Sequence, residues 1–130
     1  MKTATLIARV LLGLIYLLFG INFFFPFMPM NQPKMSEAAT AFSGGLFGSG
    51  YFFQYMKVLE ILSAIALLIN RFTAFFLLVL LPISLHIFLF HIVLAPAGAV
   101  IGIGIIALNL FLCVAYFKYY KQVFTFEPKI

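Results

Sequence analysis

Apolar residues in this chain of 130 residues gather in four long runs, which short polar or turn-forming segments separate. The runs cover about 4–25, 51–69, 72–93 and 98–117. About 20 apolar residues at about 1.5 Å rise per residue cross a hydrocarbon core about 30 Å thick. No run shows the strict alternation of a transmembrane β-strand. The pattern therefore predicts an all-α polytopic membrane protein, a four-transmembrane-helix bundle that forms a single membrane domain over 1–130.

The composition agrees with this class. The chain is 65% hydrophobic and only 8% charged, whereas soluble domains are about a quarter charged. The net charge of +5 comes from Lys and Arg residues that are scattered singly, so the sequence predicts no nucleic-acid partner and a lipid bilayer as the main surroundings. A single Cys excludes an internal disulfide and a C-x-x-C redox pair.

The distribution of charge predicts the orientation of the chain. Basic residues fall mainly on the side shared by the N-terminus, the second loop and the C-terminus: Lys2, Arg71, Lys118, Lys121 and Lys129. The other side has only Lys34, which Glu37 opposes. By the positive-inside rule both termini are cytoplasmic, and we expect a bacterial cytoplasmic (inner) membrane. The first run is too long for a cleaved signal peptide, and Arg9 interrupts it.

The loop 26–50 is predicted to face outward and to contain a short helix. Pro26, Pro29 and Pro33 close the first run. Ser36 and Glu37 can then cap a helix on the membrane surface or over the mouth of the bundle. Its apolar residues recur at helical spacing: Met35, Ala38, Ala39, Phe42 and Leu46. Four glycines occur within 43–50, and this segment is expected to be a flexible connector.

Polar residues occur inside all four runs, at comparable depths. Glu60 and Asn109 lie almost at the midpoints of their runs, and Lys57 and His86 lie about 4–6 Å toward the outside at 1.5 Å per residue. Ionisable residues at such depths are costly and usually face the interior of a bundle. We expect an intramembrane polar pocket, and its candidate binding residues are Arg9, Asn22, Lys57, Glu60, His86 and Asn109.

Lys57 and Glu60 are the central pair of this set. They are three residues apart, about 60° around a helix, so both side chains can point inward and interact. Arg9 is expected to reach Glu60 if the first two transmembrane helices are neighbours. Two interpretations stay open: a buried ion pair that fixes helix packing, and a site for a ligand or a proton.

The two histidines predict no metal site. His86 and His91 are five residues apart, about 140° around a helix, so they are not expected to face one cofactor together. Only Cys113 could be added as a further ligand of this type. His91 is expected to be solvated or to cap a helix end near the outer interface.

Small and aromatic residues predict where the helices meet each other and where they meet lipid. Close helix contacts are expected at the small residues Gly13, Gly20, Ser63, Ala64, Ala66, Gly98, Gly102 and Gly104. Phe and Tyr residues gather at the outer ends of the first two runs. They form either an interface belt or an apolar mouth for a flat, lipid-like ligand such as a quinone.

The order of these features resembles the DoxX family of small four-helix membrane proteins. The resemblance rests on "ARVLLGLIYLLFGINFFF" at 8–25, "KVLEIL" at 57–62, "LLPISLHIFLFHIVLAPAG" at 80–98 and "ALNLFLCVAYFKYYKQVF" at 107–124. It implies that Arg9 and Glu60 match the charged intramembrane positions of the family. It also implies a link to quinone-related oxidoreduction through a partner protein.

Three functional hypotheses follow. The first is a DoxX-like subunit or binding module that acts beside a membrane or redox partner, with quinone as the candidate cofactor. The second is a small proton-coupled transporter, and the third is a structural or assembly subunit without a ligand. No catalytic motif occurs in the sequence, so a non-catalytic subunit is favoured over an enzyme. Homo-oligomerisation stays open.

Overall fold

The computed structural model describes residues 2–27 and 35–130, and these residues are mostly helical and contain no strand. The helices are α1 (Lys2–Phe24), α2 (Glu37–Gly48), α3 (Phe52–Ile69), α4 (Thr73–Val93), η1 (Pro96–Gly98), α5 (Ala99–Ala115) and η2 (Phe117–Tyr119). The all-α fold class is therefore confirmed. Pro29, Pro33 and Lys34, which entered the predictions for the first loop, lie outside the described residues.

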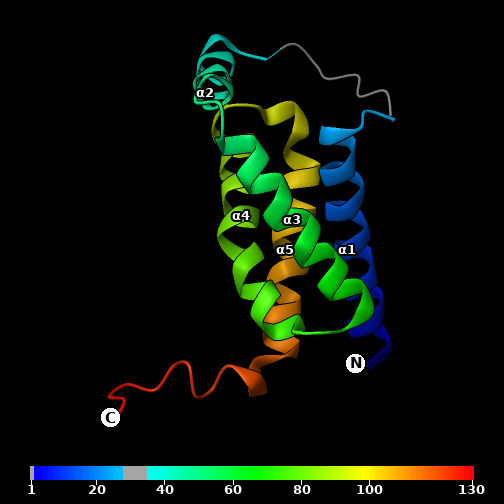
Figure 1. Ribbon diagram of the computed structural model, residues 1–130, viewed down its shortest axis with the longest axis vertical. Helices are drawn as coiled ribbons and strands as arrows, with labels where there is room; N and C mark the ends of the chain where they lie inside the picture. Colours follow the sequence, from blue (N-terminus) through cyan, green and yellow to red (C-terminus); the bar gives the residue numbers. More distant parts are fainter. Residues whose placement is uncertain (1, 28–34) are drawn as a thin grey trace.

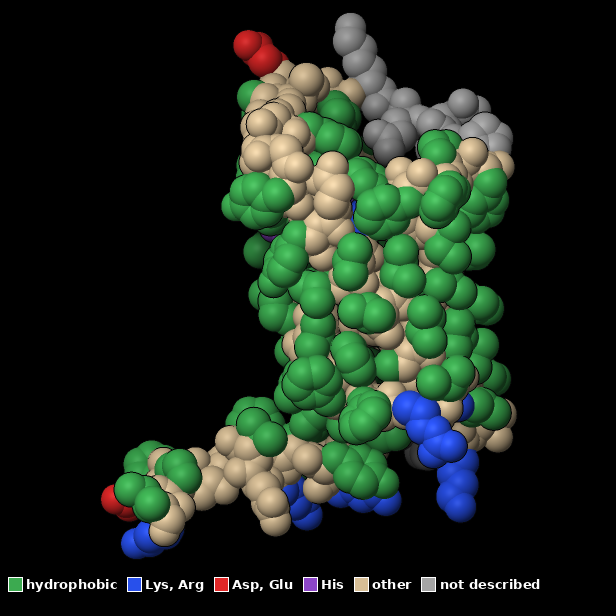
Figure 2. Space-filling view, viewed as in Figure 1, with side chains coloured by type: hydrophobic (Ala, Val, Ile, Leu, Met, Phe, Trp, Pro, Cys, Tyr) green, Lys and Arg blue, Asp and Glu red, His purple; other side chains and the backbone are tan. Residues whose placement is uncertain are grey.

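Helices α1, α3, α4 and α5 run along one another as a bundle, and α2 lies at the end opposite to both termini (Figure 1). Each of these four helical segments is long and apolar enough to cross a membrane, the last one including the turn that begins at Pro96. On the face seen in Figure 2, the side chains along the length of the bundle are mostly apolar. The protein is thus a polytopic membrane protein, and the prediction from hydrophobic patterning holds.

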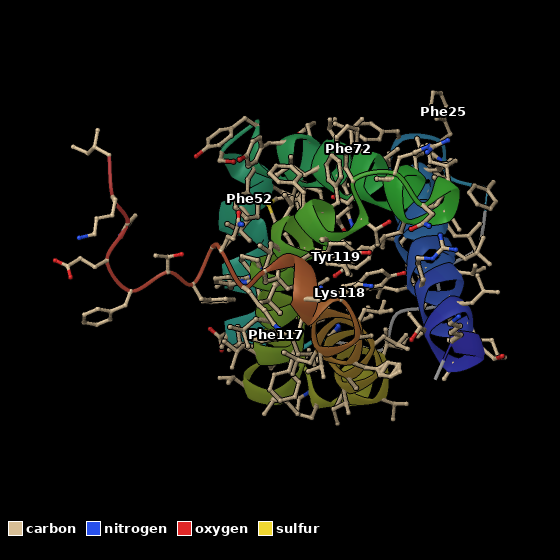
Figure 3. The ribbon with its side chains drawn as sticks, turned by 90° about the horizontal axis from the view of Figure 1, so that it is seen from below. Phe25, Phe52, Phe72, Phe117, Lys118 and Tyr119 are labelled. Carbon is tan, nitrogen blue, oxygen red and sulfur yellow. The ribbon has the colours of Figure 1, made fainter. Side chains whose placement is uncertain are left out.

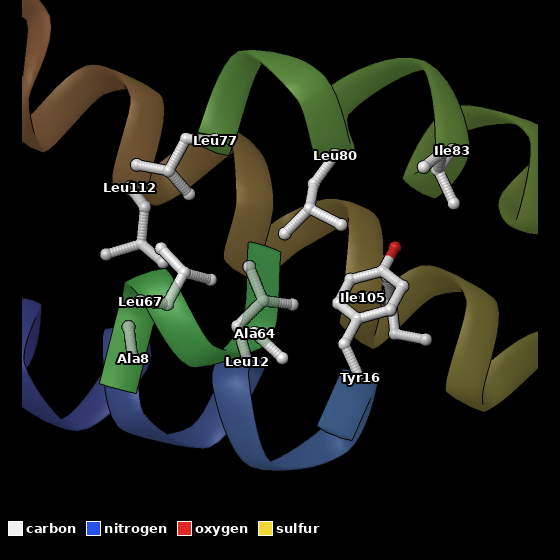
Figure 4. Close-up of a cluster of buried hydrophobic side chains, with 10 residues drawn as sticks. All are labelled: Ala8, Leu12, Tyr16, Ala64, Leu67, Leu77, Leu80, Ile83, Ile105 and Leu112. Carbon is white, nitrogen blue, oxygen red and sulfur yellow. The ribbon is translucent and has the colours of Figure 1, made fainter. Parts of the chain in front are cut away.

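Buried aliphatic side chains and one tyrosine fill the core between the four helices (Figure 4). The cluster consists of Ala8, Leu12, Tyr16, Ala64, Leu67, Leu77, Leu80, Ile83, Ile105 and Leu112. Most of these side chains have no exposed surface at all. Because lipid is as apolar as leucine, such packing stabilises the bundle by close contact between the helices.

Glycines allow α1 to approach α3 closely. A Cβ atom at Gly13 would lie 3.0 Å from Leu68, and one at Gly20 would lie 2.6 Å from Cγ1 of Ile61. The predicted packing role of these two glycines is confirmed. The same prediction for Gly104 is wrong, because a Cβ atom there would meet nothing within 4 Å.

Helix α2 begins as the sequence predicts but continues further. Ser36 is its N-cap, and the hydroxyl of Ser36 accepts a hydrogen bond from the Ala39 N–H at 3.2 Å. The helix then runs through Gly44 and Gly45 to Gly48, so the expected flexible connector is wrong for most of its length. Glycine costs only about 1 kcal/mol in a helix, and contacts of the neighbouring aromatic side chains with the bundle can offset that cost.

The segment after α5 crosses the end of the bundle that carries the termini. Phe117, Lys118 and Tyr119 lie at this end of the bundle, in front of the helices when the molecule is seen from below (Figure 3). The buried Tyr120 donates a hydrogen bond from its hydroxyl to the carbonyl oxygen of Ala74 in α4 at 2.6 Å. Lys and Arg side chains gather at this end (Figure 2).

Candidate functional site

A cavity of about 1050 Å³ lies in the half of the bundle covered by α2. Side chains of all four long helices, of α2 and of the turn between α4 and α5 line it. Its wall is mainly aromatic and aliphatic, with a few polar groups: Tyr16, Asn22, Ser36, Ser43, Lys57, Glu60, His86 and His91. The cavity has the apolar lining and the few converging polar groups that are typical of small-molecule sites.

Helix α2 covers the cavity and contacts the α4 side of the bundle at two places. At its start, the hydroxyl of Ser36 donates to the carbonyl oxygen of Leu94 at 3.0 Å. One turn and a half later, the ring of Phe42 packs against His86 and Phe90, with centroid distances of 5.7 and 5.9 Å. These contacts connect α2 to α4 and place an aromatic ring directly over His86.

Three phenylalanines from α1, α2 and α3 close another side of the cavity. The rings of Phe47 and Phe53 are 4.3 Å apart, and Phe23 lies 6.3 and 6.1 Å from them. All three residues line the cavity. Part of the aromatic group predicted from the sequence therefore borders the cavity, although Phe47 is also 61% exposed.

Lys57 and Glu60 form the ion pair that the sequence predicts. The Lys57 Nζ lies 3.3 Å from Oε2 and 3.4 Å from Oε1 of Glu60. The Glu60 side chain is 4% exposed and that of Lys57 is 21% exposed, so the carboxylate depends on this ammonium group for compensation. Both residues line the cavity, and together with His86 they also border a smaller hollow of about 70 Å³ between α3 and α4.

His86 and His91 both line the same cavity, contrary to the expectation from their angular separation. The cavity extends from the side of α4 that faces α3 to the turn between α4 and α5. It therefore borders two different sides of α4. The Nδ1 of His91 lies 3.3 Å from the carbonyl oxygen of Ala95, within hydrogen-bonding distance. His91 therefore lies in the last turn of α4, and its ring contacts the turn that follows the helix. Asn22 also lines the cavity, and its Oδ1 accepts from the Phe27 N–H at 3.0 Å.

Arg9 does not reach Glu60. Its guanidinium group is buried and donates to the carbonyl oxygen of Leu67. Leu67 lies seven residues beyond Glu60 in α3, about 10 Å along the helix. The first two transmembrane helices, α1 and α3, do pack against each other, but Arg9 satisfies a main-chain carbonyl near the C-terminal end of α3 and does not line the cavity.

Asn109 belongs to a buried hydrogen-bonded network that the sequence analysis missed. Its Nδ2 donates to the hydroxyl of Ser84 at 2.8 Å, and its Oδ1 accepts from the thiol of Cys113 at 3.5 Å. The Ser84 hydroxyl is also 2.6 Å from the phenol oxygen of Tyr16. Tyr16 and Ser84 each lie within two residues of the midpoints of their apolar runs, and this depth was the available signal.

The network connects the cavity to the core of the bundle. Tyr16 lines the cavity, whereas Ser84 and Asn109 are fully buried and do not. Asn109 therefore contacts the candidate site only through other residues. Within residues 2–27 and 35–130, no group of three or more His, Cys, Asp or Glu side chains is arranged to hold a metal ion.

Comparison of the chain with protein-family models, with curated proteins and with solved structures gave no match.

Proposed function

We propose that this protein is a small membrane-embedded binding module whose cavity takes a flat, apolar molecule with a polar head, of the quinone class. The observation that carries the proposal is the cavity itself, in which aromatic walls meet the Lys57–Glu60 pair and His86. The sequence resemblance to the DoxX family supports the same ligand class.

The dimensions and lining of the cavity fit such a molecule. Ligand sites commonly have volumes of about 300–1,000 Å³ and bury most of the ligand, and the cavity of about 1050 Å³ provides that space. The rings of Phe42 and His86 are tilted by 34° to each other and both line the cavity, where each offers an aromatic surface to a flat ring. An isoprenoid tail would find aliphatic side chains on the same wall, such as Ile87 and Ile101.

The polar groups of the cavity would bind and orient the head of the ligand. The ammonium group of Lys57 can donate to a carbonyl oxygen while it still pairs with Glu60, because an ammonium has three donors. The Glu60 carboxylate and the imidazole of His86 can each hold a proton near that oxygen. A bound quinone would supply the capacity to accept electrons and protons, and a partner redox protein would exchange the electrons.

The proposal includes the position of the protein in the membrane. Basic side chains at the end that carries the termini support a cytoplasmic location of that end in a bacterial inner membrane. The cavity and α2 would then lie in the outer half of the membrane, with α2 at the interface. In this position a lipid-soluble ligand can reach the cavity from the bilayer.

Equilibrium binding of a labelled short-tail naphthoquinone to the protein in lipid nanodiscs tests the proposal. Glu60→Gln should weaken binding at least tenfold, because it removes the charge that positions Lys57. Gln54→Ala is a matched control on an exposed position of the same helix, and its binding should equal that of the wild type. Unchanged binding by correctly inserted Glu60→Gln would contradict the proposal. A separate measurement of proton flux, with the wild-type protein in liposomes, tests the alternative of a transporter, which observed flux would favour.

A further inference from the structure

The direction of the buried hydrogen bonds identifies a group that can donate to the ligand. The thiol of Cys113 donates to Oδ1 of Asn109, and Nδ2 of Asn109 donates to the hydroxyl oxygen of Ser84. Ser84 thus already accepts one hydrogen bond from the core side. The oxygens of Ser84 and Tyr16 are 2.6 Å apart, a distance at which either hydroxyl can be the donor.

Ser84 has no other place for its proton. Its side chain is fully buried, and a buried hydroxyl that only accepts leaves its own proton without a partner, which is costly. Among the described residues the phenol oxygen of Tyr16 is the one acceptor within hydrogen-bonding distance of the Ser84 hydroxyl, apart from the amide nitrogen that donates to it. The Ser84 O–H therefore donates to Tyr16.

The proton of Tyr16 must then point away from Ser84. No other acceptor in the described part of the chain lies within hydrogen-bonding distance of the phenol oxygen. Tyr16 lines the cavity, although it is only 1% exposed. We infer that Tyr16 is a binding residue that donates its phenolic O–H to an acceptor oxygen of the molecule in the cavity.

This inference rests on the proposed function and adds a requirement to the ligand. The molecule must carry a carbonyl or hydroxyl oxygen at the end of the cavity bordered by Tyr16, and a hydrocarbon of the same shape would leave the phenol without an acceptor. Ser84 and Asn109 are positioning residues, because they act on the ligand only through the direction of the Tyr16 hydroxyl. Tyr16 and the Lys57–Glu60 pair come from different helices, so they can contact different parts of one ligand.

Binding of two matched probes tests the requirement. The probes are a short-tail naphthoquinone and the naphthalene with the same tail, which has the same rings and no acceptor oxygen. Tyr16→Phe keeps the ring and removes the donor, so it should weaken binding of the quinone about fivefold, the worth of about one hydrogen bond. Binding of the naphthalene should not change. Equal losses for both probes would show that Tyr16 only supports the cavity wall and would overturn the inference.

The positioning role has its own control. Ser84→Ala should reduce the preference for the quinone over the naphthalene, because the phenol oxygen no longer accepts the hydrogen bond that directs and strengthens its own donation. Ser84→Thr keeps a hydroxyl and should restore the preference. A preference that is unchanged in Ser84→Ala would contradict the assigned direction.

A measurement without ligand separates this inference from the proposed function. The infrared C–O stretch of ring-labelled tyrosine, assigned by subtracting the Tyr16→Phe spectrum, distinguishes a phenol that accepts a hydrogen bond from one that donates. In Ser84→Ala the phenol oxygen of Tyr16 no longer accepts a hydrogen bond, and the band should shift accordingly. If the side-chain amide of Asn109 had its oxygen toward Ser84, Ser84 would donate to Asn109 and Tyr16 would donate to Ser84. A band typical of a phenol that donates to Ser84 would therefore overturn the inference, even if the quinone binds. Failure of both probes to bind to the wild type, with the expected band present, overturns the proposed function and the ligand requirement but leaves the bond direction standing.

Discussion

The imidazole of His91 occupies the space that a side chain at position 98 would need. A Cβ atom at Gly98 would lie 2.5 Å from both Cε1 and Nδ1 of His91. The same ring contacts Gly102 one turn further along α5. The close approach of α4 and α5 next to the cavity therefore depends on two glycines that accommodate one histidine.

Gly98→Ala should destabilise the protein by about 1–3 kcal/mol, because the added methyl group forces the His91 ring out of its place. The free energy of unfolding in lipid bicelles measures the effect. Gly104→Ala in α5 is the matched control, since a Cβ atom there meets nothing within 4 Å. The control should be neutral or slightly stabilising, and equal losses in the two variants would contradict the proposed role of the His91 contact.

Removal of Lys57 alone should cost more stability than removal of both members of its ion pair. Lys57→Met leaves the carboxylate of Glu60 buried without a partner, and such a loss costs about 3–5 kcal/mol. The double variant Lys57→Met with Glu60→Gln removes that charge and should recover most of the loss. A double-mutant cycle on unfolding measures the coupling, and additive effects would mean that the pair contributes no interaction energy.

Alanine in the glycine-containing half of α2 should stabilise the helix that covers the cavity. Gly44 and Gly45 are helical, and a Cβ atom at either position meets nothing within 4 Å. Each Gly→Ala change should contribute about 0.5–1 kcal/mol, and slower hydrogen exchange of the α2 amides would show it. Gly50→Ala should have the opposite effect, because Gly50 has a φ of 82°. Faster exchange in the Gly44 and Gly45 variants would contradict the helical assignment.

The Tyr120 hydroxyl should contribute stability that depends on pH. Burial raises the pKa of the Tyr120 phenol from its ordinary value of 10.0, so the folded state favours the neutral form, which donates to Ala74. The folded pKa is higher than the unfolded one, so the advantage of wild type over Tyr120→Phe should be constant below pH 10, at about 1 kcal/mol. It should decrease as the pH rises above 10, where the unfolded chain ionises first. A difference that is constant up to pH 12 would contradict this pKa shift.

The candidate site was predictable where it depends on neighbours in the sequence. Lys57 and Glu60 are one helical turn apart, so helix geometry alone allows them to pair. The Ser36 cap of α2 is similarly local. Arg9 was assigned incorrectly because a run that is apolar on all sides does not indicate which direction a side chain faces. For the same reason, Tyr16 and Ser84 could be placed at the right depth but not against each other.

The sequence by itself determined that the chain is a bundle of four membrane-spanning helices, because lipid leaves no backbone alternative for apolar runs of this length. It also determined the approximate helix ends, the Lys57–Glu60 pair and the depth of each polar group. Only the tertiary structure decided that α2 continues through its glycines and covers a cavity, that both histidines line this cavity, and that Asn109 contacts Ser84. These features depend on how the helices are rotated about their own axes, and close packing of side chains from distant parts of the chain sets that rotation.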